Sequence, residues 1–163
     1  MHIYISNNKL SISDYKIKCV VGKRGIGVKR KEGDQITPKG KYKIKSILYR
    51  NDRISNFKTT INKLAIKKDM GWCDDPKSNQ YNKLVKFPFP FRAERLHITN
   101  NTYDIVLVLN YNLNPTIKNK GSAIFLHIAK KNYKKTEGCI AVKKIELRKI
   151  IKIINKKTII NIN

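Results

Sequence analysis

The chain has 163 residues, with 36 Lys and Arg against 11 Asp and Glu, which gives a formal net charge of +25. This length is typical of one domain, and the hydrophobic share of 40% excludes a disordered chain, so we expect a single folded domain over residues 1–163. Three cysteines, Cys19, Cys73 and Cys139, exclude a closed disulfide framework and form no CxxC pair. No metal site and no cofactor are predicted.

The positive charge by itself suggests a polyanionic partner such as nucleic acid, lipid head groups or cell-wall polymer. However, the cations are mostly Lys and are spread along the chain, and abundant Lys, Ile and Asn together are what an AT-rich coding sequence favours. Base-edge recognition favours Arg, and single-strand binding favours alternating basic and aromatic residues. No specific nucleic-acid partner is therefore predicted, although a non-catalytic basic module for nucleic acid or anionic glycan stays an alternative.

No stretch of about 18 apolar residues is present, so no membrane span is predicted. The N-terminus lacks the basic start and the long apolar run of a secretory signal. This predicts a cytoplasmic protein for the sequence as it stands, or an envelope or periplasmic protein if a signal has been removed. A monomer is expected.

Alternating apolar residues separated by polar turns predict strands over the first part of the chain. The expected strands are 2–6, 10–13 and 15–21, followed by a glycine-rich loop at 22–33 and a strand at 41–48. Thr37-Pro-Lys-Gly40 has the residues of a turn that leads into that last strand. Poor periodicity from about 50 to 100 predicts a long irregular cap segment over a functional site.

Regular structure is expected again in the second half. Residues 103–111 and 122–128 are apolar enough for central strands, and 139–142 follows as another. Four isoleucines near one face at helical spacing predict a helix over 143–155, before a closing strand at 158–162. They are Ile145, Ile150, Ile153 and Ile154. The predicted class is mainly β, a β-sandwich or flattened barrel with one helix near the C-terminus.

Two apolar segments end in reactive side chains. His127 ends one predicted strand and Cys139 begins the next, so we expect them to be neighbours. An imidazole within hydrogen-bond reach takes the thiol proton and later protonates a leaving amine, which favours Cys139 as nucleophile and His127 as base. Gly138 allows a sharp turn that frees amides for an oxyanion hole. The competing interpretation is that Cys139 is a small buried hydrophobic residue and that His127 is a histidine of the core without a catalytic role.

Two separated motifs resemble those of YkuD-type L,D-transpeptidase catalytic domains. They are Gly33-Asp-Gln-Ile-Thr-Pro-Lys-Gly-Lys-Tyr42, and Ser122-Ala-Ile-Phe-Leu-His127 followed by Thr136-Glu-Gly-Cys-Ile-Ala-Val142. The resemblance implies a bacterial β-sandwich enzyme that acts on peptidoglycan stem tetrapeptides, with an acyl-enzyme on Cys139 and release of the terminal D-alanine. An amine would then give a cross-link, a free D-amino acid would give exchange, and water would give L,D-carboxypeptidase action. The residues do not distinguish these outcomes.

The resemblance also implies roles for individual groups. The carbonyl of Ile128 is expected to orient the second ring nitrogen of His127, and Gly138 with Cys139 is expected to supply the oxyanion contact. Further candidates for substrate contact are Glu137, Thr136, Ser122, Arg92, Arg95, Tyr81 and Trp72. For the last two, packing within the cap segment is the more favoured interpretation.

Two positions depart from the family pattern. Glu137 stands where many members have His, and Ala141 stands where they have Arg or Asn. A carboxylate at Glu137 is expected to hold a protonated imidazole or a substrate ammonium group. The stem carboxylate must then bind another group, for which the candidates are Arg92, Arg95 and Arg50. His97 is a weaker candidate for the base than His127, because no Cys accompanies it in the local sequence.

Overall fold

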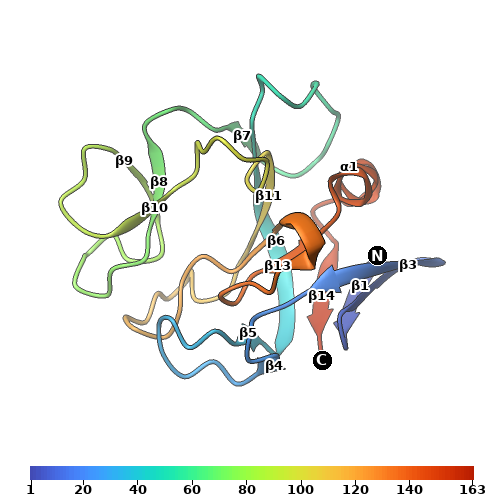
Figure 1. Cartoon of the computed structure of the whole chain (residues 1–163), viewed down its shortest axis with the longest axis horizontal. Helices are drawn as coiled ribbons and strands as arrows, with labels where there is room; N and C mark the ends of the chain where they lie inside the picture. The colour runs from blue at the N-terminus through green and yellow to red at the C-terminus, as the bar shows by residue number, and fades with distance from the viewer.

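The computed structural model describes residues 1–163 and is mainly β, with a single α-helix (Figure 1). The strands are β1 (His2–Ser6), β2 (Lys9–Ile12), β3 (Tyr15–Val20), β4 (Ile26–Gly27), β5 (Thr37–Pro38), β6 (Gly40–Tyr49), β7 (Lys63–Ala65), β8 (Met70–Cys73), β9 (Leu84–Lys86), β10 (Ala93–Arg95), β11 (Ile105–Leu109), β12 (Phe125–Ile128), β13 (Ile140–Val142) and β14 (Ile159–Ile162). The 3₁₀ turn η1 (Lys131–Tyr133) precedes β13, and the helix α1 (Lys144–Ile153) precedes β14.

Nine strands form the main sheet, in the order β11-β12-β13-β3-β2-β1-β14-β6-β7. The long strand β6 pairs with β14 through its first residues and with β11 through its later ones. This second pairing closes the sheet into a barrel-like ring from β11 round to β6. The predicted mainly β class is confirmed, whereas the arrangement is barrel-like and the predicted sandwich is not established.

The strands predicted from alternation are present. In β1, for example, Ile3 and Ile5 are buried between exposed neighbours, because successive side chains of a strand point to opposite faces. β1 pairs in parallel with β14, so the two ends of the chain lie next to each other. The main core is aliphatic and includes Leu10, Leu107 and Leu126. The strands of this core hold the residues of the site described below.

The cap segment at 50–100 is more regular than predicted. It contributes β7 to the main sheet, and β10, β8 and β9 form a separate three-stranded sheet. Figure 1 shows this cap sheet on the opposite side of the molecule from α1. All four residues of β8, Met70–Cys73, are buried, so the strand has no polar face. The alternation that identifies a half-exposed strand is therefore missing from its sequence.

The helix α1 is found where it was predicted, but its buried face differs from the prediction. Leu147, Ile150 and Ile151 are buried, together with Ile154 just after the helix. These positions follow the i, i+3, i+4, i+7 spacing of one helical face. Ile145 and Ile153, predicted on that face, are exposed. The helices of this structure are too short or too polar to cross a lipid bilayer.

Replacing Ile150 with Ala should lower the free energy of unfolding by about 2–5 kcal/mol, because its side chain fills a closed part of the core. Ile145→Ala is the matched control on the other face, where the side chain is 60% exposed. It should change stability by less than about 0.5 kcal/mol. Urea denaturation followed by circular dichroism measures both. Equal losses would contradict the assignment of the buried face.

Candidate active site

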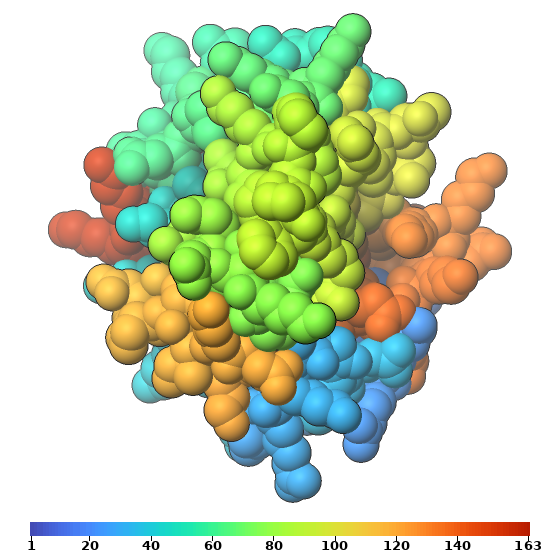
Figure 2. All heavy atoms as spheres, turned by 90° about the vertical axis from the view of Figure 1, so that its left-hand side faces the viewer, coloured from blue at the N-terminus to red at the C-terminus, as the bar shows by residue number.

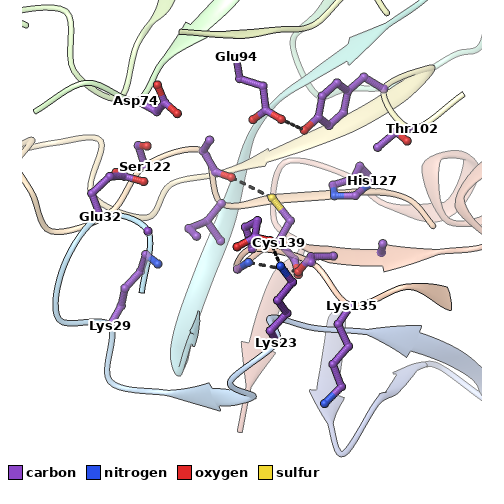
Figure 3. Close-up of a pocket in the computed structure, with 18 of the residues that line it drawn as sticks. Lys23, Lys29, Glu32, Asp74, Glu94, Thr102, Ser122, His127, Lys135 and Cys139 are labelled. Atoms are coloured by element: carbon purple, nitrogen blue, oxygen red, sulfur yellow. Dashed lines mark hydrogen bonds and ion pairs between the residues drawn. The ribbon is translucent and has the colours of Figure 1, made fainter. Parts of the chain in front are cut away.

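The parallel pairing of β12 and β13 brings His127 and Cys139 together. The register places His127 opposite Ala141. Cys139 precedes Ala141 by two residues, so the side chains of all three point to the same side of the sheet. Figure 3 shows the imidazole beside Cys139, with a ring nitrogen turned toward the sulfur. The short side chain of Ala141 leaves the space beside the imidazole open to the cleft.

Cys139 carries a thiol that is protonated in this arrangement. Its Sγ lies 3.0 Å from the carbonyl oxygen of Ala123 and donates a hydrogen bond to it. Burial, and then the negative charge of Glu94, raise the pKa of the thiol to about 12. The other two cysteines, Cys19 and Cys73, are fully buried. Among the three thiols, that of Cys139 alone lines the cleft.

His127 is held as a neutral base. Its Nδ1 lies 3.0 Å from the carbonyl oxygen of Ile128, and because a carbonyl can only accept, Nδ1 carries the proton. Burial lowers the pKa of the imidazole to about 4, although the hydrogen bond to Ile128 acts in the opposite direction. The ring of Tyr103 packs edge-on against the imidazole at 5.4 Å between centroids. Nε2 therefore keeps a free lone pair for the thiol proton.

The Thr37 hydroxyl connects the Thr-Pro-x-Gly motif to the turn at Gly138, which precedes Cys139. It donates to the carbonyl of Gly138 at 2.8 Å and accepts from the amide of Gly22 at 2.8 Å. Gly138 has a φ of 141°, and a Cβ there would lie 3.1 Å from the carbonyl oxygen of Ile36. Both the backbone conformation and the close approach therefore require glycine at this position.

The amide groups of Gly138 and Cys139 are not equivalent. The amide of Gly138 donates to the hydroxyl of Thr136 at 3.2 Å, and that hydroxyl donates in turn to the carbonyl of Cys139 at 2.5 Å. The amide of Cys139 makes no hydrogen bond within the protein. It is thus the donor available to an oxyanion, whereas the amide of Gly138 is already engaged.

These groups line a cleft of about 850 Å³. Figure 2 shows the cap segment, coloured green to yellow, above a recess that the glycine-rich loop in blue and residues 130–137 in orange enclose from the other sides. Of the predicted substrate contacts, the cleft wall includes Glu137, Thr136, Ser122 and Arg92. It does not include Arg95, Tyr81, Trp72, Arg50 or His97. No group of three or more His, Cys, Asp or Glu residues is arranged to hold a metal ion.

Glu137 makes contacts other than those expected. Its carboxylate accepts from the ammonium of Lys23 and, at 2.8 Å, from the amide of Gln35. The contact with Lys23 lowers the pKa of Glu137. The carboxylate is therefore committed to these partners and does not contact the imidazole of His127. Among the arginines, Arg92 pairs with Asp74, whereas the buried Arg50 pairs with Asp52 outside the cleft.

Trp72 acts at a distance from the cleft. Its ring packs against Phe125, and its Nε1 donates to the Asn82 side chain at 2.9 Å. The same oxygen of Asn82 accepts from the amide of Ala123 at 3.0 Å. Ala123 has a φ of 51°, in the left-handed region, and its carbonyl receives the Cys139 thiol. Trp72 and Asn82 thereby hold the turn that positions the thiol, a role that no local sequence pattern indicates.

A buried ion pair, which the sequence did not predict, lies next to Gly138. Lys29 Nζ lies 2.6 Å from the carboxylate of Asp34, and both side chains are almost fully buried. Burial would raise the pKa of Asp34, but Lys29 and two backbone amides lower it to about 2. Gly121 makes room for this pair, since a Cβ there would lie 2.2 Å from Lys29 Cε. The positive charge of Lys29 also lowers the pKa of Cys139, against the effect of burial.

Asp34→Asn should remove part of the acid sensitivity of folding. The ordinary pKa of Asp is about 3.9, so the contribution of Asp34 is complete above that value and is lost as the pH falls through the folded-state pKa of about 2. The free energy of unfolding of the wild type should therefore fall more steeply between about pH 4 and about pH 2. At neutral pH the variant should be less stable by about 3–5 kcal/mol, because Lys29 is left buried without its counter-charge.

Chemical denaturation at a series of pH values measures both effects, with Glu146→Gln on α1 as a control that keeps the wild-type slope. Parallel pH dependences for the wild type and Asp34→Asn would contradict the role assigned to this pair.

A comparison with protein families identifies the chain. The model of the L,D-transpeptidase catalytic domain, YkuD, matches residues 1–162. A comparison with curated proteins finds no match. The family match spans both the strands that bring His127 to Cys139 and the loop that joins Thr37 to Gly138. The chain therefore belongs to the family of L,D-transpeptidase catalytic domains, which are peptidoglycan-modifying enzymes.

Proposed function

We propose that the protein is a cysteine acyltransferase that acts on peptidoglycan stem tetrapeptides. Cys139 attacks the carbonyl of the third residue, and the terminal D-alanine leaves as the free amino acid. The observation that supports this most directly is the placement of His127 and Cys139 on one face of two paired parallel strands. A thiol and an imidazole so placed, with the second ring nitrogen bound to a carbonyl, are the parts that acyl transfer requires.

Formation of the acyl-enzyme begins from a neutral pair. The thiol turns from the Ala123 carbonyl to Nε2 of His127, which takes its proton as the sulfur attacks. The tetrahedral oxyanion accepts a hydrogen bond from the amide of Cys139. The imidazolium then gives its proton to the departing amine of D-alanine, so the C–N bond breaks as the thioester forms. Proton and charge balance is restored at the end of this half-reaction.

The second half-reaction releases the acyl group from Cys139. An amine of another stem, deprotonated by His127, attacks the thioester, forms an amide and returns the proton to the sulfur. Water in place of the amine would give L,D-carboxypeptidase action, and a free D-amino acid would give exchange. The cleft, of about 850 Å³, is within the size range of ligand-binding pockets, and all three outcomes start from the same acyl-enzyme.

We expect a disaccharide-tetrapeptide and, separately, a carbapenem to acylate the wild type but not Cys139→Ala. Intact-protein mass spectrometry detects the adduct, and analysis of the released peptides distinguishes cross-linking from trimming. Cys73→Ala is the matched control, because it removes a cysteine that lies outside the cleft. An adduct on Cys139→Ala, or none on folded wild type with reduced cysteines, would contradict the proposal.

The rate of acylation should rise between about pH 3 and about pH 5 and then stay level through neutral pH. The acid limb is expected because His127, with a pKa of about 4, acts as a base only when it has lost its proton. The level region is expected because the thiol, with a pKa of about 12, stays protonated.

His127→Gln should slow acylation by about 10²–10⁴-fold and abolish the acid limb. Single-turnover mass spectrometry at each pH measures this. An inflection at the ordinary histidine value of about 6.5 would show that burial does not control the base.

A further inference from the structure

Acidic residues are concentrated in the cleft although they are scarce in the chain. Only eleven residues are Asp or Glu. Four of them line the cleft, namely Glu32, Asp74, Glu94 and Glu137. Lys23 neutralises Glu137. In Figure 3, Asp74 and Glu94 lie above Cys139, and Glu32 lies to its left beside Ser122 and close to Lys29, whereas Lys23 and Lys135 lie below Cys139. A lysine-rich composition explains scattered cations, but it does not explain this concentration of carboxylates.

Two of these carboxylates keep oxygens that are free to bind a ligand. Glu32 accepts from the phenol of Tyr81 through Oε2, and no donor contacts Oε1. Asp74 accepts from Nε of Arg92 at 3.0 Å through Oδ1, and no donor contacts Oδ2. The side chain of Arg92 is 61% exposed, so solvent screens its charge. Each carboxylate is therefore held by one protein partner and has one oxygen left for the cleft.

A buried hydroxyl group at the same end of the cleft has no partner. Ser122 is 6% exposed and lines the cleft. Its Oγ is the one buried side-chain polar atom in the structure that makes no hydrogen bond. The Tyr81 phenol is close enough for Ser122 to lower its pKa, but it donates its proton to Glu32 and accepts from the amide of Gly121, so it gives Ser122 no donor. Leaving such a group unpaired is costly, so a donor from a ligand would be favoured at this position.

The charges of neighbouring carboxylates act on Glu94 at this end of the cleft. Burial raises the pKa of Glu94, and the charges of Asp74 and Glu32 raise it further. Glu94 accepts a hydrogen bond from the Tyr103 phenol, which lowers its pKa but does not reverse the shift. Asp74 and Glu32 thus disfavour the charge of Glu94, whereas the charge of Lys130 acts in the opposite direction. A bound cation would relieve this repulsion.

We propose that Glu32, Asp74 and Ser122 form a subsite for a primary ammonium group of the substrate. An ammonium has three donors and no acceptor, which matches two free carboxylate oxygens and a hydroxyl oxygen. The inference rests on the proposed function, which places the reacting carbonyl at Cys139. Two sources offer the same chemistry: the side-chain amine of a diamino acid in the acyl donor, and the amine of the acceptor.

Binding to Cys139→Ala tests the subsite without any reaction. The probes are a stem tetrapeptide and a stem tripeptide with lysine at the third position, each with a free and with an acetylated side-chain amine. Isothermal titration calorimetry should show that, for the tetrapeptide, the tripeptide or both, the probe with the free amine binds at least about tenfold more tightly than its acetylated counterpart. Adding Glu32→Gln or Asp74→Asn should abolish this preference, whereas adding Glu146→Gln should preserve it.

The substitutions are isosteric, and the new amide at Glu32→Gln can still accept from Tyr81, so the fold should be retained; thermal denaturation checks this. Equal affinities for free and acetylated probes in the Cys139→Ala protein, or a preference that both substitutions leave intact, would overturn the subsite.

Acylation in the wild-type background identifies the source of the amine. If the donor supplies it, Glu32→Gln slows acylation by the free tetrapeptide about tenfold and leaves acylation by the acetylated tetrapeptide unchanged. If the acceptor supplies it, acylation is unchanged and transfer to the tripeptide amine slows instead. Normal acylation without any amine preference would reject the subsite and leave the proposed function standing. An amine preference in binding, with no acylation of Cys139, would reject the proposed function and leave the subsite standing.

Discussion

The parallel pairing of β12 with β13 is the constraint on which the site depends. A strand presents alternate residues to opposite faces, so a shift of the register by one residue would turn Cys139 away from His127. The connection between these strands, residues 129–139, is short for a parallel crossover and contains η1 rather than a full helix. Other contacts must therefore fix the register, and the bond from the Thr37 hydroxyl to the Gly138 carbonyl is one of them.

The pairing of β12 with β13 also explains why the two proposed reacting groups, the thiol of Cys139 and the imidazole of His127, are neutral. Both side chains are placed against the core, where charge is disfavoured, so burial lowers the pKa of His127 and raises that of Cys139. A pre-formed thiolate and imidazolium would lie in this same environment at a considerable energetic cost. The arrangement instead suits transfer of the proton during attack, when the developing charge is met by the free amide of Cys139. Under the proposed mechanism, the site thus stabilises the transition state rather than a charged resting state.

Much of the fold could be predicted from the sequence, because most strands of the ring bury one face and alternate accordingly. The placement of Cys139 beside His127 could be predicted as well, since each residue lies at the end of an apolar segment, whereas their catalytic roles stay a proposal. The strands of the cap could not, because β8 is buried on both faces. The contacts that join distant segments could not be predicted either. Neither the hydrogen bonds by which Trp72 and Asn82 hold Ala123 nor the Lys29–Asp34 ion pair produces a periodic pattern in the sequence.

The net charge is another property of the sequence that does not predict where a substrate binds. A value of +25 describes the whole surface and favours approach to any polyanion, which includes the peptide-bearing polymer on which this family acts. It says little about the position of a bound substrate, because a uniform positive surface attracts without orienting. Orientation requires a local departure from the average, and in the proposed subsite the carboxylates that line the cleft would provide one. Long-range attraction and local selection are therefore separable: the proposed subsite needs only the few acidic residues of the cleft, whatever the origin of the abundant lysines.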